Sequence, residues 1–199
     1  MLEFDPLDEY PIHQVPLSMR YVGTSDRNVY DRCIFQGVDH DADAFFITGL
    51  GVYPNLGVID AYATVRRGNR QWAVRMSGAR PDDKQSQQVG PYRIEVVKPF
   101  REIRIVCDAD DHGVGFDLTY RSEYGPLAEP QHVRRQGDRI LLDAARFAGV
   151  GTFEGELRVD GETIAVTPDR YTATRDRSWG IRPVGEPEPP GRPNEFNNI

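Results

Sequence analysis

The stretch Glu102-Ile-Arg-Ile-Val-Cys-Asp108 alternates apolar and polar side chains, and Val114-Gly-Phe-Asp-Leu-Thr-Tyr-Arg121 does the same a few residues later. Successive side chains of a β-strand point to opposite faces, so a period of two gives each segment one apolar face. The connecting Asp110-Asp-His-Gly113 is rich in residues that favour turns. Together the two segments predict an antiparallel hairpin with one face against a core.

The same period of two returns along most of the chain. Residues 152–159 set Phe153, Leu157 and Val159 against charged neighbours. Only residues 139–147 have the pattern of a short helix, and they fit a strand followed by a tight turn equally well. We therefore expect an all-β, antiparallel fold with little helix outside residues 139–149. The other candidate strands are residues 31–37, 43–50, 57–67, 70–76, 92–98, 162–167 and 171–179.

Charge and hydropathy exclude several classes of protein. The 199 residues carry 24 Lys and Arg against 31 Asp and Glu, a formal net charge of −7. Nucleic acids and anionic membranes attract clustered cations, so this acidic chain is predicted to bind neither. No stretch is long and apolar enough to span a membrane, and the acidic residues 1–11 lack the apolar run of a secretory signal. We expect a cytoplasmic protein without a membrane span.

Proline marks both ends of the chain. Pro6, Pro11 and Pro16 cannot donate a backbone N–H to a sheet, so residues 1–28 are expected to form an extended arm. Prolines return after residue 182, and residues 183–199 have the composition of a linker or tail. Residues 29–182 are then the β domain.

Metal, disulfide and cofactor sites are not expected. The two cysteines, Cys33 and Cys107, cannot build a disulfide framework, and we expect both to be free and buried, with a single disulfide as the alternative. The four histidines are scattered, and residues 39–50 lack the glycine and glutamate of a calcium loop. Gly49-x-Gly51 lacks the third glycine and the following helix of a dinucleotide site.

The first segment with a candidate chemical role runs from Gly49 to Val65. Its glycines, Tyr53, Pro54 and Asn55 predict a tight corner between two strands. In the strand that follows, Asp60 and Tyr62 are two residues apart and share a face, where a carboxylate and a phenol can form one polar site. A row of polar side chains facing water is the structural alternative.

The second segment is Thr172-Ala-Thr-Arg-Asp-Arg-Ser-Trp-Gly180. In an unbroken strand Arg175, Arg177 and Trp179 share one face, where a guanidinium can stack on the indole. Asp176 then lies on the other face among hydroxyl side chains. The segment is either a structural clasp that closes the sheet, or a carboxylate and an aromatic ring at the mouth of a cavity.

These segments also carry a family resemblance. YPNLGVIDAY (residues 53–62) and RDRSWGIRPVG (175–185) occur with TSDRNVYDRCIFQG (24–37) and FEGELRVDGETIAVTPD (153–169). In these motifs, from about residue 25 to 185, the chain resembles the bacterial lipocalin-like family related to AttH and carotenoid 1,2-hydratase (hydroxyneurosporene synthase). The resemblance implies a lipocalin-like barrel or strongly curved sheet. It also implies a second domain of the same kind following Ile199, with this chain as the N-terminal half. A natural short form, whose Pro-rich tail replaces the linker to that domain, is the alternative.

Two classes of function follow. In the first, which we favour, the domain binds an apolar small molecule of isoprenoid, fatty-acyl or polyketide type, or serves as the non-catalytic half of a two-domain protein. In the second it is a cofactor-independent hydratase, isomerase or cyclase of an olefinic lipid, with Asp176 or Asp60 as the acid and aromatic faces to stabilise a cation. The predicted ligand-binding residues are Tyr53, Asn55, Tyr62, Arg177 and Trp179.

Overall fold

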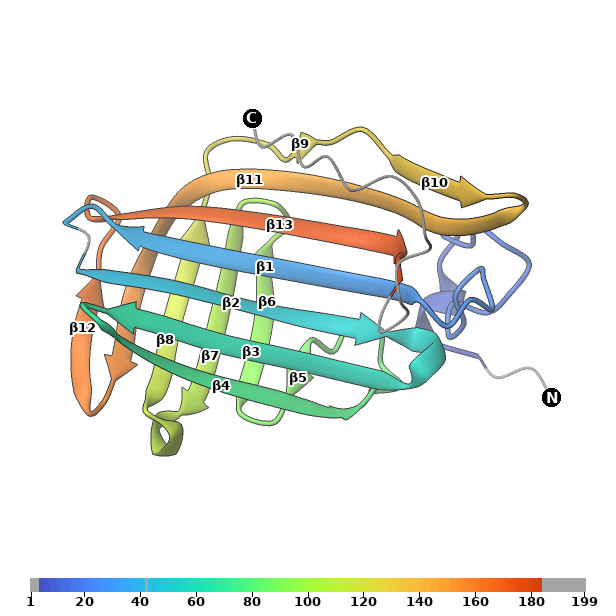
Figure 1. The fold of residues 1–199 in the computed structure, drawn as a ribbon. Helices are drawn as coiled ribbons and strands as arrows, with labels where there is room; N and C mark the ends of the chain where they lie inside the picture. Colours follow the sequence, from blue (N-terminus) through green and yellow to red (C-terminus); the bar gives the residue numbers. More distant parts are fainter. Residues whose placement is uncertain (1–3, 42, 184–199) are drawn as a thin grey trace.

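The structure is a computed structural model that describes residues 4–41 and 43–183 (Figure 1). In these residues thirteen strands pair in one antiparallel sheet, and helix is limited to three short 3₁₀ turns. The expected all-β, antiparallel fold is thereby confirmed. None of the described helices is long and apolar enough to cross a membrane. The predicted Pro-rich tail lies, apart from Pro183, outside the described residues.

Most neighbouring strands of the sheet are consecutive in the chain. The exception near the C-terminus is β13, which lies between β1 and β11. The strand order of the sheet is β4-β3-β2-β1-β13-β11-β8-β7-β6-β5, and β9, β10 and β12 pair with β11. The strands are β1 (Val29–Asp39), β2 (Ala44–Tyr53), β3 (Val58–Arg67), β4 (Arg70–Ala79), β5 (Gln88–Val89), β6 (Tyr92–Lys98), β7 (Glu102–Ala109), β8 (Val114–Arg121), β9 (Leu127–Ala128), β10 (His132–Gln136), β11 (Arg139–Val159), β12 (Glu162–Val166) and β13 (Tyr171–Ile181), and the 3₁₀ turns are η1 (Pro6–Glu9), η2 (Pro54–Leu56) and η3 (Asp110–His112).

The longest strand, β11, joins the two layers of the molecule. Its first half pairs with β13 from Asp143 to Thr152, and its second half pairs with β8 from Thr152 to Val159. Figure 1 shows β11 curving from the layer that holds β1 to β4 and β13 into the layer that holds β5 to β8. The sheet therefore folds over on itself, and the inward faces of its two layers enclose the core.

The helical interpretation of residues 139–147 is wrong, because this segment is the first half of β11. Its backbone pairs with β10 on one side and with β13 on the other. These partners lie on separate strands, and local side-chain patterns carry little information about such pairing. The alternative interpretation as a strand is correct, although the strand continues through residue 159 instead of ending in a turn.

Glycine is required where β11 turns from one layer to the other. A Cβ atom on Gly151 would collide with the backbone carbonyl of Arg121, and one on Gly155 with that of Asp117. Gly155 also has a φ of 132°, in a region that residues with a Cβ rarely adopt. The curved strand thus packs against β8 at a distance that only glycine allows.

Aromatic side chains fill the space between the layers. The Phe153 ring centre on β11 lies 5.0 Å from that of Phe46 and 5.9 Å from that of Tyr120. The hydroxyl of buried Tyr92 bonds the Thr48 hydroxyl at 2.9 Å, so this polar group has a partner inside the core. The Phe153 contacts link both layers to β11, and the hydrogen bond between Tyr92 and Thr48 links β6 to β2.

Cys33 and Cys107 are free and buried, as predicted. They are 3% and 0% exposed. Burial raises the pKa of both thiols, that of Cys107 to about 11, so they remain neutral apolar groups of the core at physiological pH.

An ion pair between the buried Asp39 and the partly exposed Arg170 lies at the end of the sheet where β1 meets β13. Asp39 is 1% exposed, and its two carboxylate oxygens accept from Nε and Nη2 of Arg170 at 2.9 and 2.7 Å. These hydrogen bonds to Arg170 hold the pKa of Asp39 below its usual value. The carboxylate is therefore ionised and paired inside the protein at neutral pH.

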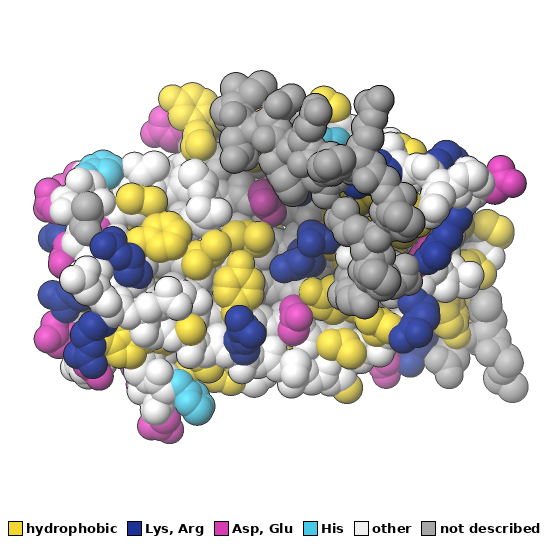
Figure 2. All heavy atoms as spheres, viewed as in Figure 1, with side chains coloured by type: hydrophobic (Ala, Val, Ile, Leu, Met, Phe, Trp, Pro, Cys, Tyr) yellow, Lys and Arg dark blue, Asp and Glu magenta, His cyan; other side chains and the backbone are white. Residues whose placement is uncertain are grey.

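The outward faces of the two layers differ in character. On β6, β7 and β8, Arg104 binds Glu95 at 3.1 Å and Asp117 at 2.6 Å, in a surface rich in such ion pairs. On the opposite layer, Figure 2 shows hydrophobic side chains gathered along the middle of the face, over β1, β2 and β3. Outward-pointing positions of these strands include Ile34 and Ile47, which are partly exposed. Only the outward face of β6, β7 and β8 has the charged composition of an ordinary solvated surface.

Replacing Gly155 with alanine is expected to lower the free energy of unfolding by about 3 kcal/mol or more, because the new Cβ meets the β8 backbone and the φ angle is unfavourable. Gly125→Ala is the matched control, because a Cβ there meets nothing within 4 Å and its φ is ordinary. Chemical denaturation of both variants measures the difference. Equal stability of the two would contradict a tight contact at the curve of β11.

Replacing Arg170 with glutamine is expected to cost about 1–3 kcal/mol of stability at pH 7, because it leaves the Asp39 carboxylate without its main donor. A carboxyl whose pKa is depressed by folding stabilises the protein above its unfolded pKa of about 4 and loses this contribution as pH falls through its folded pKa. Melting temperatures between pH 2 and 7 should therefore converge in acid for wild type and variant. Arg66→Gln, at an exposed arginine, is the control and should have the melting temperature of the wild type at every pH. A difference in melting temperature between wild type and Arg170→Gln that stays constant from pH 7 to pH 2 would contradict the ionised Asp39–Arg170 pair.

Candidate functional site

A cavity of about 520 Å³ lies at one end of the folded sheet, a volume suited to a small organic ligand. The start of β1, the end of β2, the start of β11 and the end of β13 form its walls. The segment between β4 and β5 and part of the N-terminal arm complete it. Its lining residues are Val22, Gly23, Thr24, Val29, Tyr30, Asp31, Leu50, Val52, Pro54, Arg80, Pro81, Asp83, Lys84, Ser86, Gln87, Gln131, Asp143, Ala145, Arg177, Trp179, Gly180 and Ile181.

Two of the predicted ligand-binding residues, Arg177 and Trp179, line this cavity. The Trp179 side chain is 43% exposed, and its ring centre lies 6.3 Å from that of Phe147. Leu50 and Ala145 add apolar surface from the neighbouring strands. Trp179 thus offers a large aromatic surface that is open both to the cavity and to solvent.

Arg177 is fixed by partners from two other elements. Its Nη2 lies 3.0 Å from Asp31 Oδ1 on β1, an ion pair without good hydrogen-bond geometry. Its Nη1 donates to Gln87 Oε1 at 3.1 Å. The guanidinium–indole stacking suggested by the sequence is absent from the described contacts of Trp179, because Arg177 turns toward Asp31.

Arg175, deeper along the same face of β13, stacks on other rings. It is 8% exposed, and its guanidinium carbon lies 5.1–5.6 Å from the ring centres of Phe35, Tyr120 and Phe147. Burial lowers its pKa from the usual value. Its Nε and Nη1 atoms have no hydrogen-bond partner, so the aromatic faces are its main stabilising contacts.

Asp60, Tyr62 and Asp176 gather on the opposite side of the sheet, on its outward face. The pairing places Asp60, Gly51, Arg32 and Ser178 in one row across β3, β2, β1 and β13. Tyr62 and Asp176 lie in the next row, on either side of Gly49 and Ile34. We call Arg32, Tyr53, Asp60, Tyr62 and Asp176 the outer cluster.

Two glycines make room for the outer cluster. A Cβ atom on Gly51 would stand 2.8 Å from Asp60 Oδ1 and 2.9 Å from the Tyr53 hydroxyl oxygen. One on Gly49 would stand 3.0 Å from the Tyr62 ring. The side chains of Tyr53, Asp60 and Tyr62 therefore pack directly against the backbone of β2 at these two glycines.

The carboxyl groups of the outer cluster are shifted toward the neutral form. Burial raises the pKa of Asp60, against the opposing effects of Arg32 and of a hydrogen bond donated by the Tyr53 hydroxyl. Burial likewise raises the pKa of Asp176, against the opposing charge of Arg146. The tyrosine pKa values of Tyr53 and Tyr62 also rise through burial. Two partly buried acids and two neutral phenols thus share this face of the sheet.

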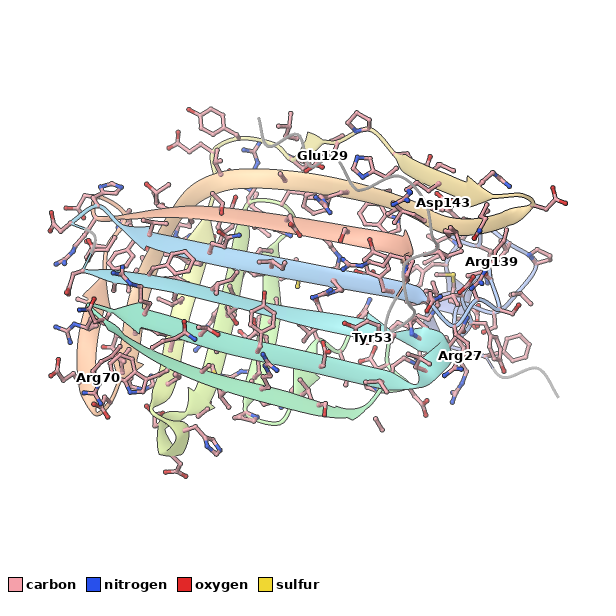
Figure 3. The ribbon with its side chains drawn as sticks, in the orientation of Figure 1. Arg27, Tyr53, Arg70, Glu129, Arg139 and Asp143 are labelled. Carbon is pink, nitrogen blue, oxygen red and sulfur yellow. The ribbon has the colours of Figure 1, made fainter. Side chains whose placement is uncertain are left out.

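Asn55 belongs to neither group of residues. Its side-chain amide donates to the carbonyls of Thr24 and Asp26, each at 2.8 Å, and so ties the N-terminal arm to the corner at η2. Figure 3 shows Tyr53 at the end of β2 and Asp143 on β11, both at the cavity end of the sheet. Only Asp143 of these two lines the cavity.

Several polar residues of the cavity were not among the predicted ones. Asp31 lies at the start of a strand, and Arg80, Lys84 and Gln87 lie in the segment between β4 and β5. This segment has no periodic pattern that would assign its side chains to a face. No group of His, Cys, Asp and Glu in the described residues could hold a metal ion.

Three solved structures share this fold. An AttH-like protein from Nitrosomonas europaea has a TM-score of 0.60 at 12% identity, over 88% of this chain and 58% of its own. Kievitone hydratase from Nectria haematococca has a TM-score of 0.58 at 18% identity, over 80% of this chain and 52% of its own. CghA, solved with Sch210972, has a TM-score of 0.53 at 14% identity, over 77% of this chain and 46% of its own.

The chain thus spans about half the length of these proteins, and at these identities the likeness is one of fold. It bears out the lipocalin-like fold expected from the resemblance to AttH-like proteins, whereas the relationship to carotenoid 1,2-hydratase and the two-domain organisation stay predictions. A comparison with curated protein sequences finds no match. The model of a family of unknown function, DUF8625, matches residues 4–199, and the chain belongs to this family.

Proposed function

We propose that this protein binds an apolar small molecule in the cavity at the end of the sheet. The observation that carries the proposal is a volume of about 520 Å³ walled by Leu50, Val52, Ala145, Trp179 and Ile181. Small-molecule sites combine such apolar walls with a few polar groups that orient the ligand. Isoprenoid, fatty-acyl and polyketide compounds are the ligand classes that fit this chemistry.

Trp179 supports this proposal more than any other side chain. A ring that is 43% exposed while lining a cavity has surface left to cover, and burying apolar area gains about 25 cal/mol per Å². The Arg177–Asp31 pair beside it supplies polar atoms for orientation. A ligand seated against the indole would therefore gain hydrophobic contact without displacing a core residue.

A second candidate function is hydration or isomerisation of an olefinic lipid at the outer cluster. Its support is the pairing of two carboxyl groups of raised pKa with two phenols on one face. In such a reaction Asp60 or Asp176 gives its proton to an olefinic carbon, so an O–H bond breaks and a C–H bond forms. Water then adds to the resulting cation and returns a proton to the carboxylate. One structural neighbour, kievitone hydratase, is by name a hydratase.

We also propose that a second lipocalin-like domain follows Ile199. The chain covers 46–58% of its structural neighbours, which leaves room in them for another unit of similar size. The reading frame downstream of Ile199 tests this directly. The boundaries of the arm and the β domain at residues 28 and 182, and the cytoplasmic location, stay predictions.

The binding function is tested with dodecanol, geraniol and dodecanoic acid by isothermal titration calorimetry. Wild-type protein should bind at least one probe, and Trp179→Ala should weaken that binding by about tenfold or more, because it removes the largest apolar surface of the cavity. The same variant should lose only about 1–2 kcal/mol of stability, since the ring is 43% exposed.

Tyr10→Ala is the control for this experiment, because Tyr10 is 59% exposed and does not line the cavity. It should bind the probes like the wild type. Absence of binding to the wild type by all three probes would contradict the proposed function. A Trp179→Ala variant that cannot fold would assign the side chain to a structural clasp.

The catalytic alternative is tested by incubation with geraniol in D₂O, where protonation of the double bond places deuterium on carbon. One of the two variants Asp60→Asn and Asp176→Asn, the one at the carboxyl that gives the proton, is expected to remove most of any exchange, by about a hundredfold, with stability unchanged. The other variant should retain it. Because the active acid is the neutral form and its pKa is raised, exchange should be fastest at low pH and decline as pH rises through that pKa. No deuterium in the wild type at any pH, as measured by NMR, would contradict catalysis on this substrate.

A further inference from the structure

Two cations line the cavity without a carboxylate partner. Lys84 Nζ donates to the backbone carbonyl of Tyr21 at 3.0 Å, and Arg80 Nη1 donates to that of Pro81 at 3.2 Å. Arg80 Nε is buried and has no hydrogen-bond partner at all. Within residues 4–41 and 43–183, no ion pair joins either side chain to an acid. Both side chains therefore have N–H donors left over after their hydrogen bonds to neutral backbone carbonyls.

The two cations also lie close enough to repel each other. Burial lowers the pKa of Lys84, and the charge of Arg80 adds to this effect, against a larger opposing effect of Asp5. Two neighbouring positive charges at a partly buried site are unfavourable unless an anion joins them. Lys84 is moreover one of only two lysines in a chain whose other cations are arginines, which makes its position at this cavity distinctive.

The nearby acids already have partners of their own. Asp31 forms an ion pair with Arg177, Asp143 accepts from Gln131 Nε2 at 2.5 Å, and Asp83 accepts from the backbone N–H of Gln85 at 2.8 Å.

Asp5 and Asp8, on the N-terminal arm, attract Lys84 only over a distance. Asp5 accepts from the backbone N–H of Leu7, and Asp8 from Ser18, Met19 and His13. The acids of this region are therefore occupied, while Arg80 and Lys84 lack an anion.

We infer that the ligand of this cavity is an anionic amphiphile, a monocarboxylic acid whose carboxylate binds Arg80 and Lys84 and whose apolar part lies against Leu50, Val52 and Trp179. This inference rests on the proposed function, because it names the class of ligand for the same cavity. A single negative charge fits better than a dianionic phosphate, because the lining already holds three carboxylates and three cations. The apolar wall comes from the sheet and the cations from the segment between β4 and β5, so the two parts of the ligand meet different elements.

The test compares dodecanoate with dodecanol, two probes of equal chain length that differ in charge, by titration calorimetry at pH 8. Wild-type protein should bind dodecanoate about tenfold or more tightly than dodecanol, since hydrogen bonds to a charged group are stronger than hydrogen bonds to a neutral one. The double variant Arg80→Gln, Lys84→Gln should lose this preference and keep its affinity for dodecanol. Should it fail to fold, as judged by circular dichroism, Lys84→Gln alone should reduce the preference.

Two control variants separate charge from other effects. Lys84→Arg keeps the cation and should keep the preference, and Lys98→Gln removes the exposed lysine outside the cavity and should have no effect. Equal affinity of the wild type for both probes, or a preference that survives the double variant, would overturn the inference and leave the proposed function standing. Failure of both probes to bind the wild type would remove the proposed function and this inference with it.

Discussion

The curve of β11 is the constraint on which the rest of the structure depends. One strand pairs with β13 through its first half and with β8 through its second, so among the described strands it alone carries the hydrogen bonding of the sheet from one layer to the other. Close approach to the β8 backbone at Gly151 and Gly155 makes that path possible. The enclosed core contains Phe153, and the cavity at the open end takes Asp143 and Ala145 from the same strand. Core, curvature and cavity are therefore consequences of one strand's geometry.

Alternation along the strands then divides the candidate residues between two sites. On β13, Arg175, Arg177 and Trp179 point inward, and Asp176 points outward between them. The inward face offers volume, an aromatic ring and unneutralised cations, which suit binding. The outward face offers acids of raised pKa that do not line this cavity, which suits chemistry only if something covers them. For this reason a binding function is the better supported of the two for the chain as it stands.

Residues 102–121 show how much the sequence alone reveals. Their alternation predicts both β7 and β8 and the burial of Cys107, because a period of two is a local property. The same alternation in residues 57–67 places Asp60 and Tyr62 on one face of a strand. It does not decide whether that face points into the core or toward solvent. The strand over residues 139–147 depends on distant partners, and Arg80 and Lys84 reach the cavity from an aperiodic segment. Such features follow from the path of the whole chain, which no local pattern records.

The most direct test of the central claim uses the two tryptophans of the chain, Trp72 and Trp179. Trp179 lines the cavity, whereas Trp72 on β4 packs partly against the core and is not among the lining residues. In a ¹⁵N-labelled sample the two indole N–H signals are assigned with Trp72→Phe and Trp179→Phe, and dodecanoate is then titrated. A ligand in the cavity is predicted to move the Trp179 signal in a saturable manner and to leave the Trp72 signal in place. Saturable binding that leaves the Trp179 signal unmoved would contradict the account.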